Sequence, residues 1–314
     1  MKKTIMFFGL FMFSSTTLFA NGSTEGKIFF NHTTDFDDRG FNAFNLKRAY
    51  LAFSNDVSSN VSYKITYDMG INSRGSAHTA FLKVAMVKLK TNFGDVSIGM
   101  QGMNMFKTME NTWGHRFVQK MPMDTYNFSP SADLGVGLTR GFGAISTSAL
   151  VTNGGGYKQA ESDSHKKLSF HAVFGEAKLN KNDGLNMGIS LSFEPYDLDS
   201  VTIENTNVMG TFAGYAGLGF RGGMEFDMKQ QNDLTSQIIC IYGTYKMSDK
   251  LSLLARIDQV DANTSVDGNG IRAIISGVHY RVDKGLTVAP TFRMTTPEGG
   301  EAKNSIVVNF QFEF

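Results

Sequence analysis

The sequence predicts an all-β protein, a closed antiparallel transmembrane β-barrel of about 16 strands with short periplasmic turns and long outer loops. Three observations predict it. Apolar and polar residues alternate along many segments, short and long connections alternate between those segments, and the last segment alternates to its final residue. Alternation with a period of two residues is typical of a strand with one apolar face. Tilted strands of about ten residues are long enough to cross a membrane.

The first residues predict export from the cytoplasm. Lys2 and Lys3 precede an apolar stretch from Ile5 to Phe13, and small and polar residues follow up to Ala20. This pattern is typical of a secretory signal peptide. We therefore expect residues 1–20 to be cleaved and residues 21–314 to form one barrel domain in the bacterial outer membrane. The apolar stretch is too short for a membrane span.

Alternation is clearest in VSYKITYDM, where Val61, Ile65 and Met69 share one face while Lys64 and Asp68 share the other. No long helical stripe follows the signal peptide. The strands are expected near residues 26–34, 43–54, 61–69, 79–90, 95–104, 132–141, 143–153, 166–179, 185–194, 207–215, 219–229, 236–247, 250–260, 270–281, 285–295 and 304–314.

The connections between these segments indicate a barrel that closes on itself. Seven short turns interleave with eight long loops, near 35–42, 70–78, 105–131, 154–165, 195–206, 230–235, 261–269 and 296–303. Such alternation is typical of outer-membrane barrels, and lipid leaves no water to satisfy an open sheet edge. The final strand, NSIVVNFQFEF, should therefore pair with the first. A secreted soluble β-protein is the alternative, but sixteen strands with only 5 prolines fit it poorly.

Composition excludes several classes of function. The chain has 30 basic and 29 acidic residues, so no nucleic-acid partner is indicated. Its single cysteine, Cys240, forms no internal disulfide. No cofactor or metal site is expected. The loop DANTSVDGNG spaces oxygen ligands like a calcium loop, but Val266 stands where glycine is needed and Arg272 where the bidentate glutamate is needed. A solvated loop is therefore the expectation, with a weak surface calcium site as the alternative.

The polar faces of the predicted strands supply side chains of both signs that would line a pore. Basic residues favour anions and acidic residues favour cations. The basic candidates are Arg48, Lys64, Lys83, Arg221, Arg256, Arg272 and Arg293, and the acidic candidates are Asp68, Glu225, Asp227 and Asp258. With the signs mixed, these groups either filter ions or pair across the lumen and keep it wet.

The 105–131 connection is the candidate constriction. It is the longest connection and holds the only tryptophan, Trp113, with Glu110, Arg116, Lys120 and Asp124. Loops of this length are usually functional or disordered. Folded inward, it would narrow the channel, and Arg116 and Lys120 would set an electrostatic filter. Alternatively it packs on the rim with Trp113 as an interface anchor.

Several stretches resemble a known family. FNLKRAYLAFSNDVSSNVSYKITYD resembles the first hairpin of the phosphate-selective porin O/P family, ENTWGHRFVQKMPMD its third long loop, and LVTNGGGY one of its strand ends. The ending with Phe310, Phe312 and Phe314 looks like the signal that outer-membrane proteins offer to the barrel assembly machinery. The resemblance implies a 16-stranded porin, commonly a homotrimer, that passes small anions or other hydrophilic solutes.

We therefore expect a porin and not an enzyme: a water-filled channel for passive diffusion of ions and small hydrophilic solutes, with anions such as phosphate as candidates. Outer-membrane lipid and lipopolysaccharide would surround it. Two alternatives remain, a barrel plugged by its own loops that serves a structural or adhesive role, and an outer-membrane hydrolase. For the hydrolase, Ser169 and His171 share a strand face, but no third orienting group or oxyanion donor accompanies them.

Overall fold

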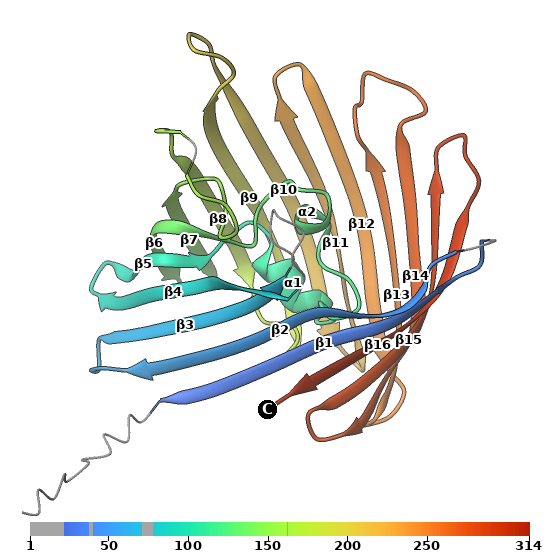
Figure 1. The fold of residues 1–314 in the computed structure, drawn as a ribbon. Helices are drawn as coiled ribbons and strands as arrows, with labels where there is room; N and C mark the ends of the chain where they lie inside the picture. The colour runs from blue at the N-terminus through green and yellow to red at the C-terminus, as the bar shows by residue number, and fades with distance from the viewer. Residues whose placement is uncertain (1–21, 38–39, 71–77, 162) are drawn as a thin grey trace, which may run out of the picture.

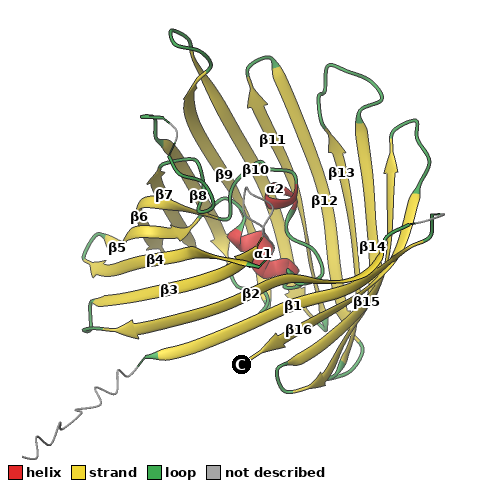
Figure 2. Ribbon diagram, viewed as in Figure 1, coloured by secondary structure: helices red, strands yellow, loops and turns green. Residues whose placement is uncertain are grey.

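The protein is a closed 16-stranded antiparallel β-barrel with two short helices inside it (Figures 1 and 2). The computed structural model describes residues 22–37, 40–70, 78–161 and 163–314, so the predicted signal peptide lies outside the described residues. No helix among the described residues is long and apolar enough to cross a membrane. The elements are β1 (Ser23–Asp35), β2 (Asn42–Asp56), β3 (Val61–Gly70), β4 (Thr79–Thr91), β5 (Gly94–Gly102), α1 (Lys107–Trp113), α2 (Pro122–Thr125), β6 (Ala132–Phe142), β7 (Ile145–Thr152), β8 (Lys167–Gly175), β9 (Gly184–Asp197), β10 (Ile203–Gly217), β11 (Phe220–Gln231), β12 (Leu234–Lys246), β13 (Leu251–Asp261), β14 (Gly270–Asp283), β15 (Leu286–Pro297) and β16 (Lys303–Glu313).

Each strand pairs with its neighbours in sequence, and β1 pairs with β16 to close the barrel, as predicted. Phe30 lies opposite Phe310, and their rings stack with centroids 4.6 Å apart. Beyond β16, the Phe314 amide donates to the Gly26 carbonyl and the Gly26 amide donates to the Phe314 carbonyl. The last residue is thus held by the first strand, which leaves no sheet edge at the seam.

The two ends of the barrel differ in their connections. We call the end where β1 begins and β16 finishes the terminal end, and the opposite end the loop end. Tight connections at the terminal end, such as residues 92–93, 143–144, 218–219 and 284–285, join consecutive strands, while most longer connections lie at the loop end. The predicted alternation of turns and loops is present.

The outer face of the barrel is an apolar belt. Ile98, Val136, Val151, Leu168 and Phe193 lie opposite one another on five neighbouring strands, and all five are exposed. Intervening positions face inward and are often polar and buried, such as Gln101, Ser169 and Ser192. A sheet with apolar residues outside and polar residues inside is built for a lipid surrounding.

Some boundaries differ from the predictions. Loops are predicted near 195–206 and 230–235, but Glu194 pairs with Thr206 and Tyr196 with Glu204, and residues 232–233 alone join β11 to β12. Polar residues extend these strands because strands outside an apolar layer need not alternate. In contrast, β8 stops at Gly175, where φ is +90°, which glycine alone adopts readily.

Candidate pore constriction

The connection between β5 and β6, residues 103–131, folds into the barrel; we call it the inner loop (Figures 1 and 2). It carries α1 and α2, and α1 contacts the inner wall at β10, β11 and β12. Gly114 ends α1 in the left-handed conformation with φ of 70°. The inward fold is the arrangement expected of a constriction, and packing on the rim is not observed.

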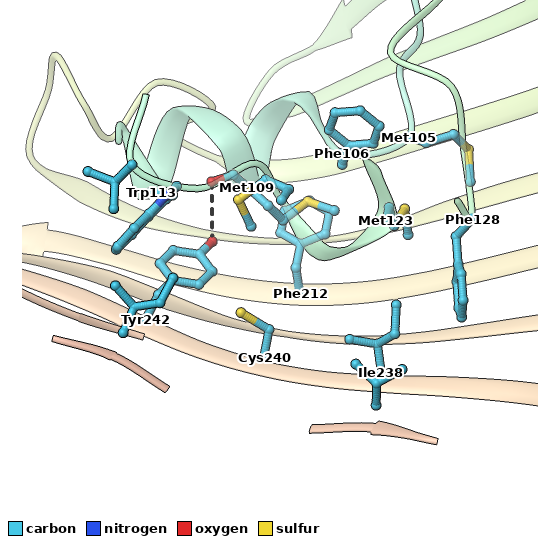
Figure 3. Packing of buried hydrophobic residues seen from close by; sticks show 14 of the residues in the cluster. Met105, Phe106, Met109, Trp113, Met123, Phe128, Phe212, Ile238, Cys240 and Tyr242 are labelled. Atoms are coloured by element: carbon cyan, nitrogen blue, oxygen red, sulfur yellow. Dashed lines mark hydrogen bonds between the residues drawn. The ribbon is translucent and has the colours of Figure 1, made fainter. Parts of the chain in front are cut away.

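An apolar core fixes the inner loop to one wall. Met105, Met109, Met121 and Met123 are fully buried and belong to one apolar cluster with the wall. Figure 3 shows Met105, Met109 and Met123 beside the wall residues Phe212, Ile238 and Cys240. The Tyr242 hydroxyl donates to the Met109 carbonyl at 3.3 Å. Methionine suits this contact because its flexible side chain fills irregular gaps between a loop and a sheet.

Trp113 is the largest buried side chain of the inner loop. Its ring meets the Tyr242 ring edge-on, with centroids 5.7 Å apart, and the Arg256 guanidinium lies 5.7 Å from its centroid. The indole N–H donates to the Gln119 carbonyl at 2.9 Å. Trp113 therefore joins α1 to both the wall and the following segment.

The predicted filter residues form a charge cluster inside the inner loop. The Arg116 guanidinium donates to Glu110 and, at 2.9 Å, to Asp124, while Lys120 donates to Asp124 at 2.8 Å. Burial alone would raise the pKa of Glu110, but the charges of Arg116 and Lys107 outweigh it and lower that pKa to about 2. The pKa of Asp124 is also lowered, because Arg116 and Lys120 outweigh its burial. Both cations are therefore neutralised by ionised carboxylates.

The wall of β1–β4 faces the inner loop with basic side chains. Arg48 donates to Asp68 at 2.8 Å, and the Tyr157 hydroxyl donates to the same carboxylate at 2.7 Å. Lys83 donates to the Tyr50 hydroxyl at 3.3 Å and lies 4.0 Å from Asp68. One carboxylate thus serves two cations, and this wall keeps an excess of positive charge.

A cavity of about 250 Å³ separates the inner loop from this wall, and we call it the basic cavity. Its lining contains five basic side chains and, among the described residues, no carboxylate. The lining residues are Phe29, Asn31, Lys47, Arg48, Arg116, Phe117, Val118, Gln119, Lys120 and Arg293. Arg48 and Lys120 also line a second cavity of about 410 Å³, which includes Asp124, Tyr157 and Lys158. The two cavities adjoin through these shared side chains.

Four predicted lining residues lie behind the inner loop and do not face the cavities. Glu225, Asp227, Arg256 and Asp258 are each at most 2 % exposed. Arg256 donates twice to Asp258 at 2.8 Å and once to the Lys120 carbonyl at 2.8 Å. The carboxylate oxygens of Glu225 and Asp227 have no hydrogen-bond partner among the described residues. They belong to the contact between loop and wall, because the loop covers that side of the lumen.

The remaining predicted lining residues lie at different places. Arg293 lines the basic cavity, Arg221 donates to the Trp113 carbonyl, and Lys64 pairs with Glu25 at 3.1 Å. Arg272 does not line the lumen. Its partner in the register is Gln259, which alternates with the inward-facing Asp258, so Arg272 lies on the outer face.

Sequence reasoning missed Lys47, Tyr157 as a ligand of Asp68, and Lys158. Tyr157 stands in the NGGGY stretch, but nothing in that pattern gives its hydrogen bond. Lys47 adjoins Arg48, and strict alternation would have directed it to the outer face. No sequence signal marks its inward position.

Of the two residues considered for hydrolysis, Ser169 and His171, only the histidine has hydrogen-bond partners in the structure. His171 shares one ring nitrogen with Thr108 at 2.8 Å and the other with Ser190 at 2.9 Å. The Ser169 hydroxyl has no partner among the described residues. His171 therefore links Thr108 of the inner loop to Ser190 of β9, and neither of its ring nitrogens binds Ser169. Nor does any group of three or more His, Cys, Asp or Glu side chains within the described part of the chain lie close enough to hold a metal ion.

Comparison with known proteins identifies the fold. No protein family and no curated protein matches the sequence. Solved structures do match. OmpF of Salmonella typhi in complex with daunomycin has a TM-score of 0.72 at 11% identity, covering 93% of this chain and 97% of its own. The anion-selective porin of Comamonas acidovorans has a TM-score of 0.69 at 12% identity, covering 93% and 99%. The trimer form of OmpT, an outer membrane protein of Vibrio cholerae, has a TM-score of 0.67 at 13% identity, with coverage of 93% and 99%.

Proposed function

We propose that the protein is an outer-membrane channel for passive diffusion of ions and small hydrophilic solutes, and that anions pass more readily than cations. No bond is made or broken. The barrel excludes lipid, and its polar interior replaces part of the hydration of a solute. Barrels of sixteen strands are wide enough to enclose an aqueous channel.

The basic cavity is the observation that carries the preference for anions. Three of its five basic side chains are paired with carboxylates outside its lining, and the other two, Lys47 and Arg293, give a positive potential beside the inner loop. A low-dielectric wall strengthens such a potential, and a positive potential lowers the energy of an anion in transit. The porin of Comamonas acidovorans, whose fold is similar, is described as anion-selective, which supports a preference for anions over cations.

Reversal potentials in a salt gradient test both parts of the proposal. The refolded protein is inserted into a planar lipid bilayer with a KCl gradient across it. Conductance steps of fixed size support the channel, and a reversal potential of the sign that chloride current requires supports the anion preference. Absence of steps contradicts the channel, while a cation-selective reversal potential contradicts the preference alone.

A plugged barrel with a structural or adhesive role is the second candidate. One observation favours it: the apolar core of the inner loop fills the lumen beside β10–β13. The same bilayer experiment separates the two functions, because a plugged barrel inserts without conducting.

The apolar belt supports lipid and lipopolysaccharide as surroundings, and the terminal phenylalanines support recognition by the barrel assembly machinery. The trimer form of the Vibrio cholerae protein supports a homotrimer. Size-exclusion chromatography with light scattering in detergent tests the homotrimer, and a monomer mass would contradict it.

A further inference from the structure

The β1–β2 pairing contains a bulge at Lys47. Arg48 lies opposite Phe29 and Leu46 lies opposite Phe30, so Lys47 is an extra residue without a partner in β1. In a regular strand Lys47 and Arg48 would point to opposite faces. Here both line the basic cavity. The bulge therefore lets two successive cations, Lys47 and Arg48, lie in the lumen, where a regular strand would place only one of them.

A second bulge repeats the arrangement on the next hairpin. Thr66 lies opposite Val84 and Tyr67 opposite Leu82, so Lys83 is the extra residue of β4. Its side chain is 12% exposed and lies near Asp68 inside the barrel. Bulges bend and re-aim a strand locally. In both places the extra residue is a lysine that lies on the lumen side, whereas lipid would penalise a lysine on the outer face.

The cations of the basic cavity differ in how they are neutralised. Arg116 and Lys120 are bound to Glu110 and Asp124, and Arg48 is bound to Asp68. Lys47 has no ion pair or hydrogen bond among the described residues. Arg293 donates only to neutral acceptors, the Gln119 amide oxygen, the Val118 carbonyl and the Asn309 amide oxygen.

This difference determines which charges an ion in the cavity meets. A cation that is paired with a carboxylate forms a dipole, whose field falls off faster than that of a single charge. An unpaired cation keeps its full field in the cavity. The unpaired positive charge of the basic cavity therefore resides on Lys47 and Arg293.

We propose that Lys47, which lies beside Arg48 on the lumen side of the β2 bulge, determines the anion preference together with Arg293, while Arg116 and Lys120 chiefly hold the shape of the inner loop. The inference rests on the proposed channel function and names its selectivity-determining residues. The permeant class it implies is a small oxyanion or halide that exchanges water for ammonium and guanidinium donors.

Reversal potentials of matched variants test the proposal. Lys47→Gln and Arg293→Gln each remove an unpaired charge, and each should lower the chloride-to-potassium permeability ratio by about two- to fivefold. The pair variant Lys120→Gln/Asp124→Asn removes one charge of each sign and should shift the ratio less. Lys250→Gln, in an exposed turn at the terminal end, should leave it unchanged. A shift by the pair variant as large as that of Lys47→Gln overturns the proposal.

Chemical restoration of the charge tests the position of Lys47 without relying on a refolded Gln variant. Lys47→Cys is treated in the bilayer with 2-aminoethyl methanethiosulfonate, whose aminoethylthio group forms a disulfide with the thiolate while methanesulfinate leaves. The new ammonium should return the permeability ratio toward that of the untreated wild type. Treated wild type is the control, because its single cysteine, Cys240, is fully buried.

Failure of this inference is distinguishable from failure of the channel. If Lys47→Cys conducts and treatment leaves its ratio unchanged, the bulge lysine does not face the permeant ions and the inference fails. If neither wild type nor variant conducts, both the proposed function and the inference that rests on it fail.

Discussion

Two walls of the same barrel contact the inner loop differently, one through apolar packing and the other across a cavity. The wall of β10–β13 presents apolar residues such as Phe212, Ile238 and Tyr242 and holds the loop by packing. The wall of β1–β4 presents Arg48 and Lys83 and meets the loop across a cavity. Dispersion and burial require close contact, whereas uncompensated charges favour water between them. The distribution of apolar residues therefore decides on which side of the lumen a passage remains.

The largest expected effect comes from removing the apolar attachment. Trp113→Ala empties a fully buried site between α1 and Tyr242, and truncation of a buried tryptophan costs about 3–5 kcal/mol. We expect the inner loop to detach, so that it is cleaved by protease and channel conductance rises. Phe93→Ala, in an exposed turn, is the control. Unchanged cleavage of Trp113→Ala would show that packing against β10–β13 does not hold the loop.

A smaller effect is expected from the ion pair behind the inner loop. Asp258→Asn leaves the Arg256 guanidinium buried without its carboxylate, and breaking a buried pair costs about 3 kcal/mol. The double variant Arg256→Leu/Asp258→Leu should recover much of this loss, although the Lys120 carbonyl then loses its donor. Thermal unfolding in detergent measures both variants. A double variant less stable than the single one would contradict a desolvated pair as the cause.

The attachment should also weaken at acidic pH through His115. Both ring nitrogens of this buried residue lack a partner among the described residues. Burial, then the charges of Arg221 and His279, hold its pKa well below 6.5. The detached loop binds a proton near pH 6.5, so attachment is fully favourable above that pH and loses up to about 1.4 kcal/mol for each unit below it.

Protease cleavage of the inner loop between pH 7 and pH 5 measures this dependence. We expect cleavage to rise as pH falls below about 6.5, and His115→Leu should flatten the profile. His32→Phe, at a position outside the inner loop, controls for other titrations. An identical profile for wild type and His115→Leu would exclude His115 as the cause.

The sequence predicts the barrel well because the alternation of apolar and polar residues within each strand shows which side chains face lipid and which face the lumen. Alternation and the lengths of the connections predict the strand number and the closure by Phe310, whereas the inward fold of the loop near Trp113 is one of two alternatives that these patterns leave open. The selectivity of the site depends on features that alternation hides. The bulge at Lys47 puts two successive residues on the lumen side, which strict alternation does not allow, and Arg272 is one position out of phase with the inward-facing residues of β14. Pairing across the lumen, as between Arg116 and Asp124, depends on the pose of a loop that no local pattern encodes.

The smallest expected effect concerns the basic wall. Tyr157→Phe removes the hydroxyl that donates to Asp68 and leaves Arg48 bound to the same carboxylate. Because Asp68 keeps a charged donor, the loss should be about 1 kcal/mol. A double-mutant cycle with Asp68→Asn, followed by thermal unfolding in detergent, isolates the coupling, and Tyr63→Phe is the control. Strictly additive effects would mean that Tyr157 and Asp68 do not interact. The basic wall would then be held by the ion pair between Arg48 and Asp68 without a contribution from the loop that carries Tyr157.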